Sequence, residues 1–126
     1  MTLRGVVSDR LEPLLPLRVR GPGGRELEVE AVLDTGFDGS LSSEAVAELE
    51  LEWQRRAFAR LADGSEVAVD VYEAELAWGP TWRRVAVDAA DADPLLRMRV
   101  LRRREVRVEA VEGGAVEVTL LPGERL

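Results

Sequence analysis

Hydrophobic and polar residues alternate along much of this chain, and the alternation predicts β-strands. Residues 14–20 carry a leucine or valine at every second position, and residues 26–33 alternate apolar residues with glutamates. A period of two is the signature of a strand that is buried on one face only. The glycine-rich segment 21–24 lies between the two runs, so we expect them to form a hairpin.

Two longer alternating segments flank the dipeptide Asp63-Gly64. Residues 53–61 precede it and residues 66–78 follow it. Asp-Gly between alternating segments is a strong hairpin signal, because a type I′ turn needs positive φ at both central residues. The two strands of this hairpin are longer than the strands beside them require for pairing. We therefore expect it to project from the domain, either as a surface feature or as a flap that closes over a cleft.

The other predicted elements are short. They are strands over 82–87, 105–111 and 115–121, a capped helix over 44–51, a strand or short helix over 95–101, and an acidic loop over 88–93. Residues 1–12 have no clear period and are assigned only as a leading segment that could contribute an edge strand. Many short strands with one or two brief helices predict a mainly β fold.

Composition removes several kinds of chemistry. The 126 residues include no Cys and no His, which excludes disulfides, thiol nucleophiles, Ser-His-Asp triads and the usual zinc sites. Any acid or base must be a carboxylate, Tyr72 or an arginine. The net charge of −7 argues against a nucleic-acid partner. Five arginines between residues 97 and 104 are followed by glutamates, and this favours a solvated face with ion pairs over a phosphate site.

Neither a membrane span nor a secretory signal is predicted. No apolar run approaches the roughly 20 residues that a spanning helix needs. Charged residues interrupt the first segment of the chain at Arg4, Asp9, Arg10 and Glu12. The expected location is therefore the cytoplasm, with no membrane partner.

The chemistry-bearing stretch of the chain is the segment around Asp34. Apolar residues 31–33 lead into Asp34-Thr35-Gly36, so a carboxylate is expected where a buried strand meets a glycine turn. Such a carboxylate is a candidate for acid-base chemistry. Two other interpretations remain open: a turn residue that caps backbone amides, and a calcium loop with residues 38–40. The calcium loop lacks a glutamate at its twelfth position, which is Ala45.

These motifs together resemble the retropepsin-like aspartic proteases, in particular their bacterial single-domain members. The resemblance rests on Val32-Leu33-Asp34-Thr35-Gly36, on the Asp63-Gly64 hairpin, and on the apolar pair Leu95-Leu96 that follows Pro94 and leads into a short helix. It implies one domain over residues 1–126, with a core of about 14–121. The implied fold is mainly β, a closed β-barrel forming half of an acid protease, with one or two short helices.

The resemblance also implies a function. Asp34, Thr35 and Gly36 would form the catalytic turn of a homodimeric endopeptidase that needs no metal and no cofactor. Asp38 would orient a peptide substrate or pair with Arg97 or Arg99. The flap tip, which would also contact substrate, comprises Ala62, Asp63, Gly64 and Ser65.

One position departs from the family pattern. The family normally has glycine directly after the apolar pair, where this chain has Arg97. Either the arginine turns outward and stabilises the acidic loop, or the chain keeps the fold without the protease function. The alternative to an endopeptidase is therefore a catalytically inactive module of the same fold, used for dimerisation or peptide binding.

Overall fold

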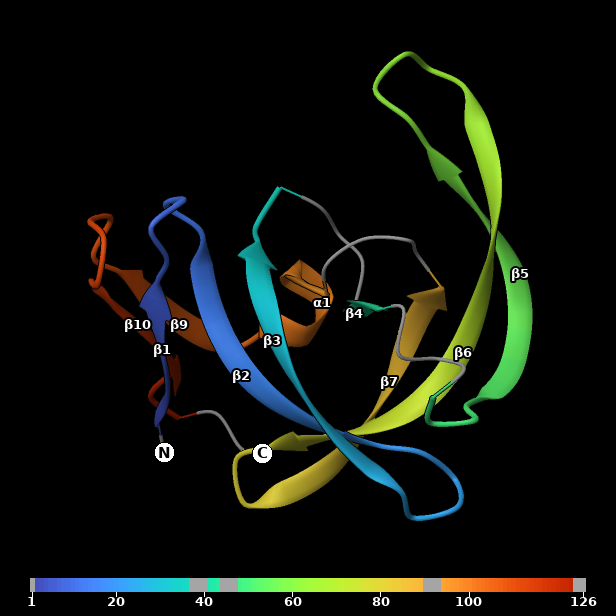
Figure 1. Ribbon diagram of the computed structural model, residues 1–126, viewed down its shortest axis with the longest axis horizontal. Helices are drawn as coiled ribbons and strands as arrows, with labels where there is room; N and C mark the ends of the chain where they lie inside the picture. The colour runs from blue at the N-terminus through green and yellow to red at the C-terminus, as the bar shows by residue number, and fades with distance from the viewer. Residues whose placement is uncertain (1, 37–40, 44–47, 90–93, 124–126) are drawn as a thin grey trace.

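The part of the chain that the structure describes folds into a strongly curved β-sheet with one very short helix (Figure 1). The computed structural model describes residues 2–36, 41–43, 48–89 and 94–123. Within them the strands are β1 (Thr2–Val7), β2 (Pro13–Arg20), β3 (Glu26–Asp34), β4 (Leu41–Ser43), β5 (Glu52–Arg60), β6 (Glu66–Trp78), β7 (Thr81–Ala89), β8 (Leu95–Arg97), β9 (Arg104–Val108) and β10 (Ala115–Leu120). The helix is α1 (Met98–Leu101).

Most predicted strands are confirmed. β2 and β3 pair antiparallel as the predicted hairpin, and so do β5 and β6. The segment 95–101 is a strand that passes directly into the helix α1. The helix predicted over 44–51 falls partly on residues 44–47, which lie outside the described residues. Its last part is wrong, because residues 48–50 form a turn and Glu50 has a positive φ of 52°.

The sheet order is β5-β6-β7-β4-β8-β3-β2-β1-β10-β9. An additional pairing joins β2 to β6 at two positions, Val19 with Leu76 and Arg20 with Glu75, and bends the sheet back on itself. The end strands β5 and β9 do not pair with each other among the described residues. The closed barrel that the resemblance implied is therefore not confirmed, since strands continue beyond the short β2–β6 contact on both sides.

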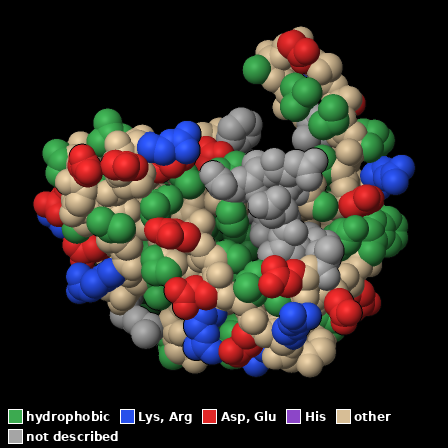
Figure 2. Space-filling view, viewed as in Figure 1, with side chains coloured by type: hydrophobic (Ala, Val, Ile, Leu, Met, Phe, Trp, Pro, Cys, Tyr) green, Lys and Arg blue, Asp and Glu red, His purple; other side chains and the backbone are tan. Residues whose placement is uncertain are grey.

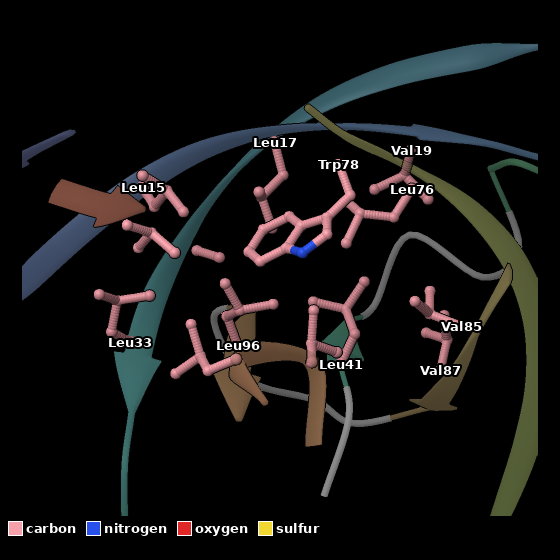
Figure 3. Close-up of a cluster of buried hydrophobic side chains, with 14 of the residues drawn as sticks. Leu15, Leu17, Val19, Leu33, Leu41, Leu76, Trp78, Val85, Val87 and Leu96 are labelled. Carbon is pink, nitrogen blue, oxygen red and sulfur yellow. The ribbon is translucent and has the colours of Figure 1, made fainter. Parts of the chain in front are cut away.

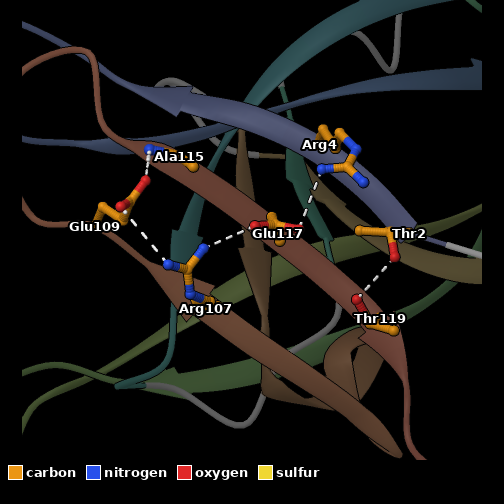
Figure 4. A network of polar contacts seen from close by, with 7 residues as sticks. All are labelled: Thr2, Arg4, Arg107, Glu109, Ala115, Glu117 and Thr119. Carbon is orange, nitrogen blue, oxygen red and sulfur yellow. Dashed lines mark hydrogen bonds and ion pairs between the residues drawn. The ribbon is translucent and has the colours of Figure 1, made fainter.

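The leading segment of the chain is more central than the sequence indicated. β1 pairs with β10 over five positions and with β2 over two, so it is not an edge strand. Polar side chains link β10 to β1 and to β9 in Figure 4. There Glu117 on β10 accepts hydrogen bonds from Arg4 on β1 at 3.2 Å and from Arg107 on β9 at 2.8 Å. These ion pairs are exposed, and each contributes little to stability.

The core lies inside the curve of the sheet (Figure 3). Its largest side chain is Trp78, 2% exposed, at the end of β6. Every second residue of β2 packs here, as the alternation predicts. The other fully buried large side chains are Leu15, Leu41, Leu76, Leu96, Val87, Val100, Val116 and Val118. Trp53 and Phe58 are instead 55% and 72% exposed, so only some of the aromatic residues are core.

Candidate active site

Asp34 is the last residue of β3, in the middle of the sheet. β3 pairs with β8 in parallel, with Leu33 opposite Leu96 and Asp34 opposite Arg97. Leu33 is 6% exposed and Leu96 is fully buried, so the strand that carries Asp34 is fixed by the core. Successive side chains of a strand point to opposite faces. Asp34 therefore extends from the face opposite to Leu33, where it is half-buried.

The carboxylate of Asp34 is held by its own turn. The backbone amide of Gly36 donates a hydrogen bond to Asp34 Oδ1 at 3.2 Å. This contact is the amide cap that a turn residue makes, and it fixes the carboxylate without burying it. A Cβ at position 36 would lie 3.4 Å from the same oxygen, at contact distance. Glycine thus leaves space beside the carboxylate, and Thr35 and Gly36 are both exposed.

Arg97 lies next to Asp34 in the register but is paired elsewhere. Its Nη1 donates to Asp88 Oδ2 on β7 at 2.5 Å, and the two side chains are only 19% and 26% exposed. Its Nε is buried without a hydrogen-bond partner. No ion pair joins Arg97 to Asp34 among the described residues. The charge of the unexpected arginine is therefore balanced by Asp88.

Asp88 is a residue whose role sequence reasoning missed. It was predicted to begin an acidic loop over 88–93, but β7 continues to Ala89 and residues 90–93 lie outside the described residues. The interpretation that Arg97 stabilises the acidic segment is correct about the partner, because Asp88 belongs to that segment. It is wrong in its geometry, since Arg97 is largely buried and Asp88 lies within a strand. The signal was the alternation of Val85 and Val87, which carries on past Asp88.

The part of the predicted site that follows Gly36 is not among the described residues. Asp38 lies outside the described residues, so its predicted pairing with Arg97 or Arg99 stays a prediction. The same holds for Gly39 and Ser40 of the calcium alternative. Among the residues that are described, no group of acidic side chains could hold a metal ion.

The four predicted flap residues, Ala62–Ser65, form the turn between β5 and β6. Gly64 has φ +88°, which favours glycine, and its amide donates to the carbonyl of Leu61 at 2.9 Å. Asp63 Oδ1 accepts hydrogen bonds from the Ser65 hydroxyl at 2.5 Å and the Ser65 amide at 2.9 Å. These bonds, that of the hydroxyl first, lower the pKa of Asp63 below its ordinary value. The tip is thus an ordered turn.

The outer part of this hairpin projects away from the body of the protein (Figure 2). Its exposed apolar side chains are Phe58 at 72%, Leu61 at 46% and Val67 at 41%. Among the described residues, no hydrogen bond or ion pair joins the turn 62–65 to the turn at Asp34. The structure therefore brings together Asp34, Thr35 and Gly36, and it leaves the hairpin tip as a separate feature.

Comparison with known proteins bears on the fold. A crystal structure of a retropepsin-like aspartic protease from Rickettsia conorii matches with a TM-score of 0.54, over 95% of this chain and 93% of that chain. The two sequences are 12% identical, so the likeness concerns the fold alone. No family model matches the sequence, and no curated protein matches it either.

The fold is therefore retropepsin-like, and the predicted resemblance is confirmed at that level. The likeness covers nearly all of both chains. The two proteins therefore share an overall architecture, and the similarity is not limited to one motif. Among the described residues, no helix has the length and apolar character needed to cross a membrane.

Proposed function

We propose that this protein is a cytoplasmic, homodimeric aspartic endopeptidase that hydrolyses peptide bonds without a cofactor. The observation that carries the proposal is the placement of Asp34-Thr35-Gly36 at the end of β3, a core strand of a retropepsin-like fold. A core-anchored strand end can hold a reacting group in a constant position. The half-buried carboxylate, with open space at Gly36, supports a role in contacting substrate.

A second copy of the chain is part of the proposal because the chemistry needs two carboxylates. The sequence contains a single Asp-Thr-Gly and no histidine that could serve as the other acid or base. A two-fold interface brings the same residue of both copies together on the symmetry axis. In this arrangement the two Asp34 side chains face each other, and Thr35 of each copy helps to fix the pair.

The reaction then follows from the proton that the two carboxylates share. Two carboxylates about 3 Å apart cannot both ionise, so they hold one proton between them, as is generally known for aspartic proteases. The ionised Asp34 takes a proton from a water, and the water oxygen attacks the scissile carbonyl carbon. The protonated Asp34 donates to the carbonyl oxygen. The Asp34 that took the water proton then donates it to the amide nitrogen, and the other Asp34 takes back the proton of one hydroxyl, so the carbon–nitrogen bond breaks and an acid and an amine are released.

The remaining predicted residues take supporting roles in this proposal. Residues 62–65 at the hairpin tip cover the bound peptide and exclude water, and Asp38 orients the peptide backbone. The Asp88 carboxylate keeps the Arg97 guanidinium away from Asp34, which supports activity despite the missing family glycine. Because the paired arginine occupies little exposed surface, it leaves the approach to Asp34 to the substrate.

The second candidate is a catalytically inactive module of the same fold that dimerises or binds peptides. The observation in its favour is again Arg97, which is paired directly opposite Asp34 in the register, where the family has glycine. A positive charge this close to a proton-sharing pair disfavours the protonated carboxyl. Peptide binding without cleavage distinguishes this module from an enzyme.

The test is to incubate the purified protein with a mixed peptide library between about pH 4 and 7, where one carboxylate of such a pair is protonated. We expect cleavage that Asp34→Asn abolishes. The matched control is Asp9→Asn, the same change at an exposed turn residue, which should cleave like the wild type. A folded dimer without cleavage at any pH contradicts the enzyme, and active Asp34→Asn refutes the role of Asp34.

A further inference from the structure

The strand β9 forms one end of the sheet, and its outer edge is unpaired among the described residues. Within that part of the chain, Arg104–Val108 pair with β10 only. In Figure 1 this end of the sheet lies on the opposite side of the molecule from the hairpin β5–β6. An unpaired strand edge presents backbone N–H and C=O groups that can bond to a further strand.

The backbone groups on this edge belong to every second residue of β9. Just beyond the strand, the Glu109 amide donates to the carbonyl of Ala115 on β10 at 2.9 Å. Positions that bond to the neighbouring strand alternate with positions that do not. The odd-numbered residues of β9 therefore bond to β10, as Glu109 does. The amides and carbonyls of Arg104, Val106 and Val108 point outward.

The charged side chains beside this edge are one acid and one base. Glu105 is exposed, and among the described residues it makes no hydrogen bond or ion pair. The side chain of Arg107 is 58% exposed; it donates to Glu117 at 2.8 Å and lies 3.6 Å from Glu109. A guanidinium has five N–H groups, so these two contacts leave donors for a further carboxylate.

The order of these charges selects one register for pairing β9 with a second copy of itself. Registers that match the outward-pointing groups and overlap well are centred on residue 105, 106 or 107. A centre at 105 places Glu105 opposite itself, and a centre at 107 places Arg107 opposite itself. Like charges directly opposite destabilise a strand pair, and opposite charges stabilise it. A centre at Val106 places Glu105 of each copy opposite Arg107 of the other, so both charges are balanced.

The other face of β9 also suits a further strand. Val106 packs partly against the core, and Val108 is 40% exposed. Their neighbours on β10, Val118 and Val116, are buried. A second copy of β9 beside Val106 therefore extends an apolar face that belongs to the core, and it covers valine surface that water otherwise contacts.

The opposite end of the sheet lacks these properties. In β5 the pairing register shifts between Trp53 and Arg55, and an irregularity of this kind bends a strand. Three exposed residues of β5 are arginines, at positions 55, 56 and 60. Irregular and charged edges commonly protect a sheet from pairing with another chain. β9 is regular by contrast, and its charges deter only the registers that oppose like charges.

We propose that the outer edge of β9 pairs antiparallel with β9 of a second copy of this chain, centred on Val106. The same surface then serves both copies, as a two-fold contact requires. The partner is a second copy because β9 supplies both the acid and the base of each ion pair. This contact is independent of the proposed peptidase activity, since it requires association and no cleavage at Asp34.

Disulfide cross-linking of the full chain tests this register. The chain has no cysteine, so a single introduced cysteine forms a disulfide only with another copy. In the proposed register Val106 lies opposite Val106 of the second copy, with Cα atoms about 5.5 Å apart, a separation that a disulfide spans. Val106→Cys should therefore give a dimer on a non-reducing gel after mild oxidation with copper phenanthroline.

Val108→Cys is the matched control for this cross-link. Residue 108 lies opposite Arg104 of the second copy, so the two introduced thiols are about 14 Å apart along the strands and should not join. No dimer from Val106→Cys overturns the proposal. Equal cross-linking by the two variants also overturns it, because it shows random collision.

Charge variants on the Val106→Cys background test the two ion pairs. Glu105→Arg opposes two arginines and should slow cross-linking by about tenfold, and Arg107→Glu should do the same by opposing two glutamates. Mixing these two variants should restore the rate, since each supplies the charge that the other lacks. Glu30→Arg, the same change at an exposed position of β3, should not slow cross-linking. A mixture no faster than either variant alone overturns the register.

Discussion

The strand pair β3–β8 and the hairpin β5–β6 are the two parts of the proposed active site, and they are built in opposite ways. β3 and β8 meet in the core, where Leu33 and Leu96 are 6% and 0% exposed. The outer part of the hairpin is exposed, and Phe58 on its strand β5 is 72% exposed. The fold therefore fixes Asp34 by burial and holds the tip through local turn contacts. A reacting carboxylate needs the first arrangement, and a movable cover needs the second.

β6 belongs to both parts and shows where one becomes the other. Its first residues, Glu66–Ala68, are exposed, whereas Ala74, Leu76 and Trp78 near its end are buried. The strand is continuous over this change, and its later part also pairs with β7. If the tip closes over a peptide as proposed, the ribbon should bend in its outer part, because the inner half is held in the core.

The largest contrast is expected for truncations in the two parts. Leu96→Ala should lower the free energy of unfolding by about 2–5 kcal/mol, because it opens a cavity behind the strand next to Asp34. Phe58→Ala should change it by less than about 0.5 kcal/mol, since the ring packs on little. Urea unfolding followed by far-UV circular dichroism measures both. Similar losses of unfolding free energy for the two variants would contradict the distinction between a buried strand pair and an exposed hairpin.

A smaller effect is expected for the ion pair that supports β8. Asp88→Asn removes the carboxylate partner of Arg97 and should cost about 1.5–3 kcal/mol, because both side chains are largely buried. The matched control is Glu66→Gln on β6, whose 3.6 Å pair with Arg60 is exposed, and it should cost less than about 0.5 kcal/mol. Equal costs in urea unfolding would show that burial does not strengthen the Arg97 pair.

The hairpin tip should respond locally. Gly64→Ala forces a Cβ into a conformation with φ +88° and should destabilise the turn by about 1 kcal/mol. Hydrogen exchange is expected to rise at the amides of the turn 61–65 and to stay unchanged in β3. Gly23→Ala in the β2–β3 turn is the control, because Gly23 lacks a positive φ and has open space around it. Faster exchange in β3 would mean that the tip and the core are coupled.

The smallest expected effect concerns the charge at the tip. The Ser65 hydroxyl is the main cause of the lowered pKa of Asp63, so Ser65→Ala should raise that pKa toward its ordinary value of 3.8. A depressed pKa stabilises the turn at pH values above the ordinary pKa, and this contribution is lost as the pH falls through the lowered one. An NMR titration of the Asp63 carboxyl measures the change. An unchanged pKa would contradict the hydroxyl contact.

The sequence was sufficient for elements whose pattern is local. β2 and β3 were predicted because every second residue faces the core, and β6 because apolar residues alternate along it. The β5–β6 hairpin was predicted from Asp63-Gly64, although only Gly64 of the two has a positive φ. Contacts between distant segments were not predictable. Residues 1–12 were expected to contribute at most an edge strand, whereas β1 lies between β2 and β10, which come from opposite ends of the chain. The bending of the sheet back on itself likewise depends on β2 meeting β6, which no local pattern encodes.

For the candidate site too, residues within one local motif were predictable, and residues from distant strands were not. Asp34, Thr35 and Gly36 are contiguous, so one motif was enough to identify them. Asp88 was missed because its partner Arg97 comes from another strand, and a single sequence does not show which strands meet.

The central claim, that one active site uses Asp34 from two copies, is tested most directly by mixing. Wild-type protein and Asp34→Asn are combined in equal amounts, allowed to exchange subunits, and assayed for peptide cleavage. If both carboxylates are required, only the wild-type pairs are active. The rate should then be about one quarter of that of the same total protein as wild type. About one half would show that each chain acts with its own Asp34, and would contradict the account.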